Sequence, residues 1–255
     1  MSGKVYLVGA GPGAPDLLTL RAAQLLAQAD IVFYDALVHP DTIALATHAE
    51  KIAVGKRCGK ASTAQRFINK RMVDAAKKYQ TIVRLKGGDP MLFGRAQEEI
   101  EALREAGVEY GIVPGITAAL AASADLGISL TRRGLSRSVA FITPRVGPGE
   151  AENDWVQTVV AADTVALYMA SGEAEAIAAR LIGAGKSAST PVAVVENASL
   201  PNARIIFSTL ANLPNRIEAL NLEGPALILL GEVYRHGAEA IIEHHIVQVK
   251  LAAQS

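Results

Sequence analysis

The sequence has a single cysteine, Cys58, so the chain cannot form a disulfide within itself. It also lacks an excess of either charge, because 25 lysines and arginines balance 25 aspartates and glutamates. A neutral protein has no global positive field that would draw it onto nucleic acid or an anionic membrane. We therefore expect a cytoplasmic protein, in a reducing compartment, that binds no nucleic acid and no membrane.

Long apolar runs are lacking as well. The most apolar stretches, residues 164–170 and 226–231, are far shorter than the roughly 20 residues that span a bilayer, and we interpret them as buried strands. The first residues, MSGKVYLVGAG, lead straight into a strand-like segment without the apolar core and cleavage site of a signal peptide. We expect no secretion.

The motifs of several enzyme classes are missing. His39 and His48 lie far along the chain from the pair His244 and His245, and no H-E-x-x-H or C-x-x-C spacing occurs, so we predict no metal site. Neither a G-x-S-x-G elbow nor a Walker G-x-x-x-x-G-K-[ST] motif is present, which removes the main support for a hydrolase or a P-loop enzyme.

What the sequence does contain is an alternation of strand and helix patterns. Short apolar runs predict strands at 5–8, 31–34, 51–54, 81–85 and 109–113. Helical spacing begins at residue 17 and returns around 42–46, 64–78 and 96–106. This alternation indicates a mostly parallel sheet with helices on its faces.

The second half of the chain predicts a second sheet. A helix over 116–126 is followed by strand-like runs at 139–142, 164–169, 192–195, 204–208 and 226–230. Pro201-Asn202 lies between two of these runs, and a hairpin there would make the second sheet mixed. We predict an α/β protein of two domains, residues 1–116 and 117–255, with a cleft between them.

Two glycine-rich loops follow predicted strands, where ligands of an open parallel sheet bind. Gly9-Ala10-Gly11-Pro12-Gly13 resembles the start of a dinucleotide fingerprint, although prolines 12 and 15 remove donors and delay the helix, so a simple tight turn is the alternative. Lys86-Gly87-Gly88-Asp89-Pro90 fits a backbone-lined pocket; alternatively, Asp89-Pro90 only caps the following helix.

Charged side chains also gather near the predicted loops. Asp35 ends the second strand behind two aromatic residues, where it could accept a proton or merely cap the next segment. Clustered cations in a neutral protein suggest a small, multiply anionic ligand, whereas each alone is more often a solvated surface group. These cations are Lys56, Arg57, Lys60, Arg84, Lys86, Arg95, Arg132, Arg133, Arg137 and Arg145.

The loops form an ordered set of motifs. The most specific is Val83-Arg84-Leu85-Lys86-Gly87-Gly88-Asp89-Pro90, and the others lie at 8–20, 34–38, 55–57, 93–99, 113–119 and 130–133. Together they resemble the tetrapyrrole methylases, the class III S-adenosylmethionine-dependent methyltransferases, and within them the uroporphyrinogen-III C-methyltransferases. The resemblance covers nearly the whole chain. Ala14 stands where the family commonly has an acid, so no role is carried to that position.

The resemblance implies a two-domain α/β homodimer that binds S-adenosyl-L-methionine between its lobes. It implies methylation of uroporphyrinogen III at C2 and C7, giving precorrin-2 for sirohaem and cobalamin biosynthesis. The family's proton acceptor matches Asp35, its proton donor matches Lys56, and Arg95, Glu98 and Arg133 match residues of substrate binding or catalysis. Its cofactor contacts match Pro12, Gly87, Gly88, Asp89, Leu92, Thr117, Ala118, Met169 and Ala198.

Three alternatives stay open. A sibling methylase acting on a later precorrin would share the fold and the cofactor loop, although 84–89 and 34–38 favour the first enzyme of the branch. An NAD-binding oxidoreductase rests on the first glycine-rich loop alone. A degenerate relative that only binds its ligands would transfer no methyl group.

Overall fold

A computed structural model of the chain describes residues 3–55, 65–146 and 154–237. The chain divides into two compact units, Met1–Ala118 and Ala119–Ser255. Each unit contains one five-stranded sheet. Among the helices of the described ranges, none combines the length and the apolar character that crossing a bilayer requires.

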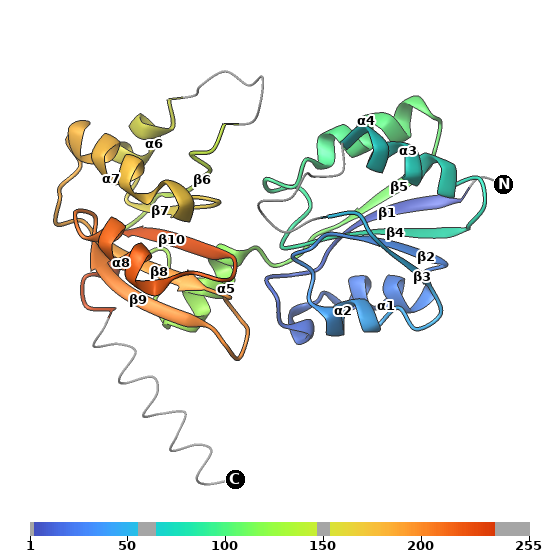
Figure 1. Cartoon of the computed structure of the whole chain (residues 1–255), viewed down its shortest axis with the longest axis horizontal. Coiled ribbons are helices and arrows are strands. Elements are labelled where there is room, and N and C mark those ends of the chain that lie inside the picture. The colour runs from blue at the N-terminus through green and yellow to red at the C-terminus, as the bar shows by residue number, and fades with distance from the viewer. Residues whose placement is uncertain (1–2, 56–64, 147–153, 238–255) are drawn as a thin grey trace, which may run out of the picture. The chain divides into compact units, whose positions relative to one another are not determined.

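The first unit is built on a parallel sheet with the strand order β3-β2-β4-β1-β5. Its strands are β1 (Lys4–Gly9), β2 (Ile31–Tyr34), β3 (Glu50–Ala53), β4 (Thr81–Lys86) and β5 (Tyr110–Val113). Its helices are α1 (Leu20–Gln28), α2 (Pro40–Ala44), α3 (Gln65–Ala75) and α4 (Ala96–Glu105). Figure 1 shows α1 and α2 on one face of this sheet and α3 and α4 on the other.

Alternation along β4 determines which side chains enter each core. Val83 and Leu85 join the apolar cluster on the α1 and α2 face, whereas Ile82 joins the cluster with α3 and α4. Arg84 and Lys86 have the same parity as Ile82, and both are buried. Two cations of one strand are therefore carried to the α3 and α4 face.

The second unit contains a mixed sheet with the order β6-β7-β10-β8-β9, in which β6 and β7 are parallel and the other pairs antiparallel. Its strands are β6 (Val139–Ile142), β7 (Thr164–Leu167), β8 (Pro191–Glu196), β9 (Arg204–Thr209) and β10 (Ala226–Gly231). Its helices are α5 (Ala118–Leu126), α6 (Trp155–Ala161), α7 (Ala174–Gly183) and α8 (Leu213–Leu220). Apolar residues of α6, α7 and α8 pack on one face and those of α5 on the other.

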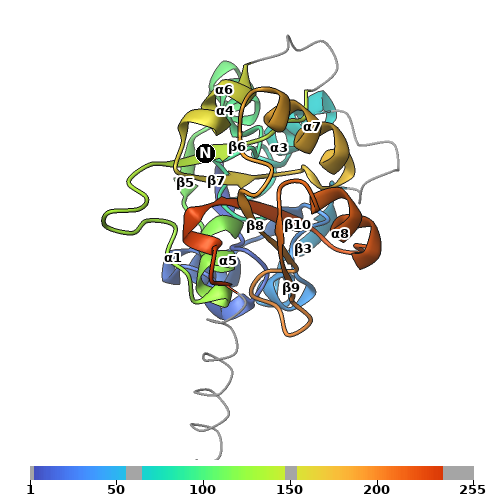
Figure 2. The same cartoon turned by 90° about the vertical axis from the view of Figure 1, so that its left-hand side faces the viewer.

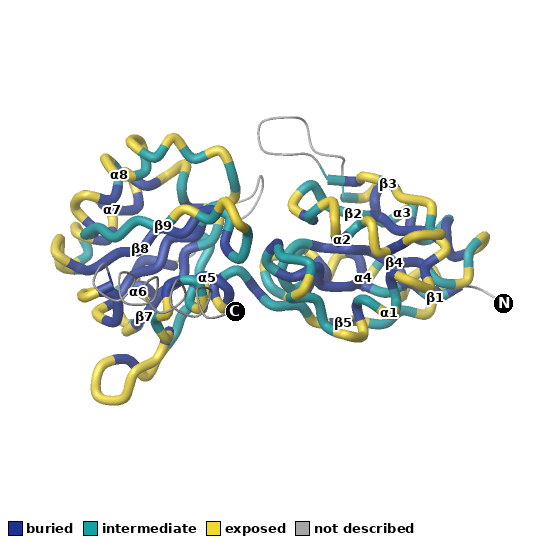
Figure 3. The backbone as a smooth tube through the Cα atoms, turned by 90° about the horizontal axis from the view of Figure 1, so that it is seen from below, coloured by how far each residue is buried: buried dark blue, intermediate teal, exposed yellow. Residues whose placement is uncertain are grey.

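The cores lie along the central strands of each sheet. Figure 2 shows α5 on the opposite side of the second sheet from α6 and α7. In Figure 3 the central strands are mostly buried, and exposed residues concentrate in the loops and on the outer helix surfaces. All six residues of β8 are buried, as expected for a strand covered on both faces.

The predicted α/β class, the parallel first sheet and the mixed second sheet are confirmed. The strand expected over 164–169 is too long, because β7 ends at Leu167 and Met169 has a left-handed backbone, with φ of 55°. The helix expected from residue 17 also begins later. A single 3-10 turn occupies Pro15–Leu17, and α1 starts behind Thr19, whose Oγ1 accepts from the Ala22 amide at 3.2 Å.

Candidate active site

Three glycine-containing loops meet at the carboxyl edge of the first sheet, after β1, β4 and β5. The Gly88 amide donates to the Gly11 carbonyl at 2.7 Å, and the Gly11 amide donates back at 3.2 Å. A Cβ on Gly115 would lie 2.2 Å from the Gly88 oxygen, and one on Gly9 would lie 2.6 Å from the Gly115 Cα. Because no side chain fits at such separations, only glycine lets these backbones touch.

Asp89 fixes the loop after β4. Its Oδ1 accepts from the Met91 amide at 2.8 Å, and its Oδ2 accepts from the Gly115 amide at 2.9 Å. The next helix, α4, begins only at Ala96, so the interpretation of Asp89 as a helix cap is wrong. The two carboxylate oxygens thus bind main-chain amides of two different loops. The carboxyl edge of the first sheet is lined by backbone atoms there, in agreement with the backbone-lined pocket expected from the glycines.

The other predicted cofactor contacts of this unit follow the same strands. They are Pro12, Gly87 and Leu92, which are half-buried, Thr117, which is buried, and Ala118, the first residue of α5. The structure thus places these residues in the loops after β1, β4 and β5, or, for Ala118, at the start of the helix that follows, and the glycine contacts hold these loops together.

Met169 and Ala198 belong to the second unit. They follow β7 and β8, which run in the same direction because each pairs antiparallel with β10. Met169 has a φ of 55° and is 49% exposed, and Ala198 is buried between Asn197 and Ser199, with φ of 53° and 71°. Left-handed backbone outside glycine is uncommon and gathers at functional sites, so both turns are candidates for ligand contacts.

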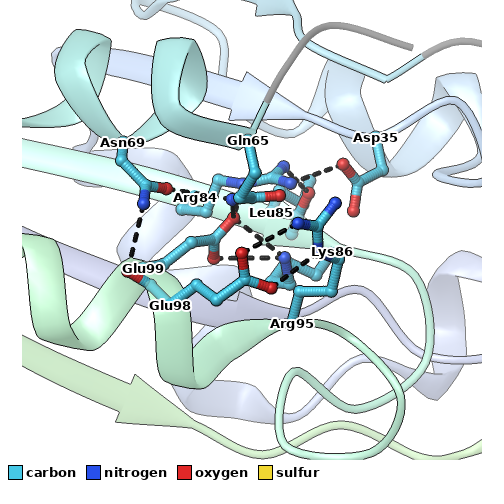
Figure 4. Close-up of polar contacts among 9 residues, drawn as sticks. All are labelled: Asp35, Gln65, Asn69, Arg84, Leu85, Lys86, Arg95, Glu98 and Glu99. Carbon is cyan, nitrogen blue, oxygen red and sulfur yellow. Dashed lines mark hydrogen bonds and ion pairs between the residues drawn. The ribbon is translucent and has the colours of Figure 1, made fainter. Parts of the chain in front are cut away.

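A buried cluster of charges lies behind Asp35 (Figure 4). Arg84 Nη2 donates to Asp35 Oδ1 at 2.5 Å, and Arg84 Nε donates to Glu99 Oε1 at 2.9 Å. Lys86 Nζ donates to the two Glu99 oxygens at 3.0 and 3.1 Å. The side chains of Arg84, Lys86 and Glu99 are 2%, 4% and 0% exposed, whereas that of Asp35 is 27% exposed. Asp35 is therefore the member of this cluster that a ligand can reach.

The local sequence explains why Glu99 lies inside. Ala96, Glu99, Ile100 and Leu103 share the buried stripe of α4, which faces the side of β4 that carries the two cations. Burial disfavours the charge of Arg84, but the carboxylates of Asp35 and Glu99 outweigh it and raise the Arg84 pKa. Burial lowers the pKa of Lys86, and the charge of Arg84 acts in the same direction.

Sequence reasoning assigned no role to Glu99, and it counted Arg84 and Lys86 among the cations for an anionic ligand. For these two that interpretation is wrong, because both are buried and paired with carboxylates of the chain. A signal was present, because two cations two residues apart in an apolar strand must share one face of the sheet. Glu99 in turn takes an apolar position of an amphipathic helix. A buried charge of either sign needs a partner, so each segment indicates that an opposite charge lies nearby without identifying which residue carries it.

Arg95 and Glu98, both predicted to act on substrate, contact each other. Arg95 Nε donates to Glu98 Oε1 at 2.7 Å and Nη2 to Oε2 at 2.8 Å, a bidentate pair whose side chains are 59% and 47% exposed. The hydrogen bonds from Arg95 lower the pKa of Glu98. Arg133 belongs to the second unit, where it lies exposed in a turn closed by the bridge between Arg132 and Ser136.

Two further predictions concern Lys56 and metal binding. Lys56, the predicted proton donor, lies outside the described residues. Within 3–55, 65–146 and 154–237, no three His, Cys, Asp or Glu side chains gather as a metal site would require.

Comparison with known proteins identifies what the chain is similar to. The family model of tetrapyrrole (corrin/porphyrin) methylases matches residues 4–214. The crystal structure of a uroporphyrin-III C-methyl transferase from Thermus thermophilus, complexed with S-adenyl homocysteine, is 39% identical, with a TM-score of 0.80 over 91% of this chain and 99% of that one. The structure of a cobalt precorrin-4 methyltransferase is 31% identical, with a TM-score of 0.80 over 90% and 95%.

The similar curated proteins are longer than this chain. A siroheme synthase from Psychrobacter sp. (strain PRwf-1) is 44% identical over 255 residues, which are 99% of this chain and 52% of that protein. One from Azotobacter vinelandii is 46% identical over 234 residues, or 91% and 50%. The chain therefore spans about half the length of the curated relatives it matches.

Proposed function

Because this chain belongs to the tetrapyrrole (corrin/porphyrin) methylase family, we propose that it is an S-adenosyl-L-methionine-dependent C-methyltransferase of uroporphyrinogen III. Methylation at C2 and then C7 gives precorrin-2, a precursor of sirohaem and cobalamin. The observation that carries this proposal is the likeness to the Thermus thermophilus enzyme, which covers 99% of that chain at a higher identity than the precorrin-4 enzyme.

The glycine loops suit the proposed methyl donor. Their backbones touch through Gly9, Gly11, Gly88 and Gly115, so main-chain groups rather than side chains line the carboxyl edge of the sheet. The proposed contacts are Pro12, Gly87, Gly88, Asp89, Leu92, Thr117, Ala118, Met169 and Ala198. When bound, the cofactor supplies an electrophilic methyl group and leaves as S-adenosyl-L-homocysteine.

The charged residues serve the tetrapyrrole that accepts the methyl group. A pyrrole carbon that takes up the methyl group leaves its ring positively charged, and loss of one proton restores neutrality. Asp35 is the proposed acceptor of that proton, since its carboxylate is the most exposed of the charged cluster. Arg95 and Arg133 are the proposed partners of the substrate carboxylates, with Glu98 orienting Arg95. Lys56 is the proposed proton donor.

The assembly and location follow from the same proposal. We propose a homodimer that works in the cytoplasm on a small tetrapyrrole. A sibling methyltransferase acting on a later precorrin is the second candidate, because the precorrin-4 enzyme superposes with the same TM-score of 0.80. The NAD-binding alternative loses its support, because the 3-10 turn Pro15–Leu17 separates the first glycine loop from α1.

The test is an anaerobic assay of the purified protein with S-adenosyl-L-methionine and enzymatically generated uroporphyrinogen III. Absorbance and mass of the product are followed together. A gain of two methyl groups is the expected result. If the tetrapyrrole gains none while the protein binds S-adenosyl-L-homocysteine, a later precorrin becomes the substrate to examine.

A further inference from the structure

The charged cluster behind Asp35 occupies a place where an apolar core could stand. Arg84, Lys86 and Glu99 are almost completely buried, where apolar residues of similar volume would often be neutral or stabilising. Their charges balance only together with Asp35, at the end of β2. In this cluster one partly exposed carboxylate directly follows a neighbouring strand. This arrangement is expected when buried groups hold a functional side chain in its orientation.

The geometry fixes one carboxylate oxygen of Asp35. Phe33 on β2 lies opposite Arg84 on β4, so the residue two positions after Phe33 comes within reach of the guanidinium. Arg84 Nη2 holds Asp35 Oδ1 at 2.5 Å, while no described residue donates to Asp35 Oδ2. Arg84 thus anchors one oxygen, and the proposed function assigns the substrate proton to the other.

Arg84 is itself held from the opposite side. Its Nε donates to Glu99 Oε1, and its Nη1 donates to the Leu85 carbonyl at 3.3 Å. Glu99 is fixed in turn by Lys86 and by Gln65 Nε2, at 3.2 Å. Because the guanidinium is planar, bonds on Nε and Nη1 determine the direction in which Nη2 points.

We propose that Arg84 is a positioning residue for the proton acceptor Asp35, and that Glu99 holds Arg84 in the orientation this requires. The inference rests on the proposed function, in which Asp35 takes a proton from the methylated ring. Arg84 touches neither substrate nor cofactor in this scheme. It sets the direction of the carboxylate, so its loss slows turnover more than it weakens binding.

The test compares Arg84→Met with a control on the same two strands. Asp30 precedes β2, and its Oδ2 accepts from the Gln80 and Thr81 amides at 2.8 Å each, so it joins β2 to β4 at the opposite edge of the sheet. Asp30→Ala should lower the thermal stability and leave kcat unchanged. Arg84→Met should lower kcat by ~10-fold to 100-fold, since a misplacement of about 1 Å can cost about 100-fold in rate.

The remaining measurements separate positioning from folding. In Arg84→Met, the KM values and the affinity for S-adenosyl-L-homocysteine should stay within about twofold of the wild type, because this change alters orientation rather than binding. Arg84→Lys keeps the positive charge but has a single ammonium group in place of the guanidinium fork, so it should recover part of the lost kcat. If Arg84→Met does not fold, Arg84→Lys takes its place in the comparison. A wild-type kcat in Arg84→Met, or equal losses in Asp30→Ala, would overturn the proposal.

A structural readout keeps the proposal separate from the identity of the substrate. Crystal structures of the wild type and of Arg84→Met should show the Asp35 carboxylate in different orientations, whichever tetrapyrrole is methylated. If the wild type does not methylate uroporphyrinogen III, the proposed function fails and these structures still decide the role of Arg84. An unchanged Asp35 orientation without the guanidinium contradicts the positioning role.

Discussion

Replacement of Gly115 by alanine tests the backbone contacts at the carboxyl edge of the first sheet. The added Cβ would lie 2.2 Å from the Gly88 oxygen and 2.9 Å from the Gly9 Cα, both of which are main-chain atoms. An ordinary carbon–oxygen contact is about 3.3 Å, so one loop has to move by about 1 Å. Overpacking of this kind costs about 1–3 kcal/mol of stability.

The larger effect of Gly115→Ala should fall on function. A shift of about 1 Å in the loop that holds Gly88 and Asp89 should lower turnover by ~100-fold and weaken binding of S-adenosyl-L-homocysteine. Titration calorimetry, thermal unfolding and the methyl transfer assay measure the three effects. Gly183→Ala is the matched control, because Gly183 ends α7 with no neighbour within 4 Å of an added Cβ. A Gly115→Ala protein with wild-type affinity and turnover would refute the reasoning.

Three further predictions address single side chains. Asp35→Asn should bind S-adenosyl-L-homocysteine as the wild type does but lose at least ~10-fold in kcat, because general-base catalysis contributes at least that much; near-normal turnover removes Asp35 from the mechanism. Arg95→Ala should raise the KM for the tetrapyrrole with little change in the KM for the methyl donor, and unchanged kinetics would exclude Arg95 as a carboxylate partner. Hydrogen bonds from Lys70 and Lys77 lower the pKa of Asp74 to about 2. This folded-state pKa lies below the unfolded value of about 4. The contacts of Asp74 with the two lysines therefore stabilise the protein above about pH 4, and the stabilisation is lost as the pH falls toward 2. The melting temperatures of wild type and Asp74→Asn should therefore differ at pH 7 and converge near pH 2, and a constant difference would contradict this origin.

The architecture was predictable wherever periodicity and flanking residues agree. The strands at 31–34 and 139–142 have the predicted bounds, because each is a short apolar run with clear turn signals on both sides. The hairpin at Pro201-Asn202 joins β8 and β9 as predicted, and it makes the second sheet mixed. The predictions were wrong at positions where the backbone leaves regular geometry, as at Met169, whose apolar side chain gives no sign of a left-handed φ.

The site was predictable in part. Glycines and Asp89 in the loops after strands indicate a backbone-lined edge, and the structure brings those loops together. The charged cluster was not predicted, because a single charged residue in an apolar segment does not identify its partner. Only the packing of α4 against β4 shows that Glu99 and Arg84 meet, and only the register of β2 with β4 brings Asp35 to the same guanidinium.

The most direct test of the central claim is the position of the transferred methyl groups. The protein is supplied anaerobically with uroporphyrinogen III and S-adenosyl-L-methionine that carries a ¹³C-labelled methyl group, and the product is examined by NMR. We expect two labelled methyl groups, one on C2 and one on C7. Label at other ring carbons, or transfer only to a tetrapyrrole that is already methylated, would contradict the proposed reaction.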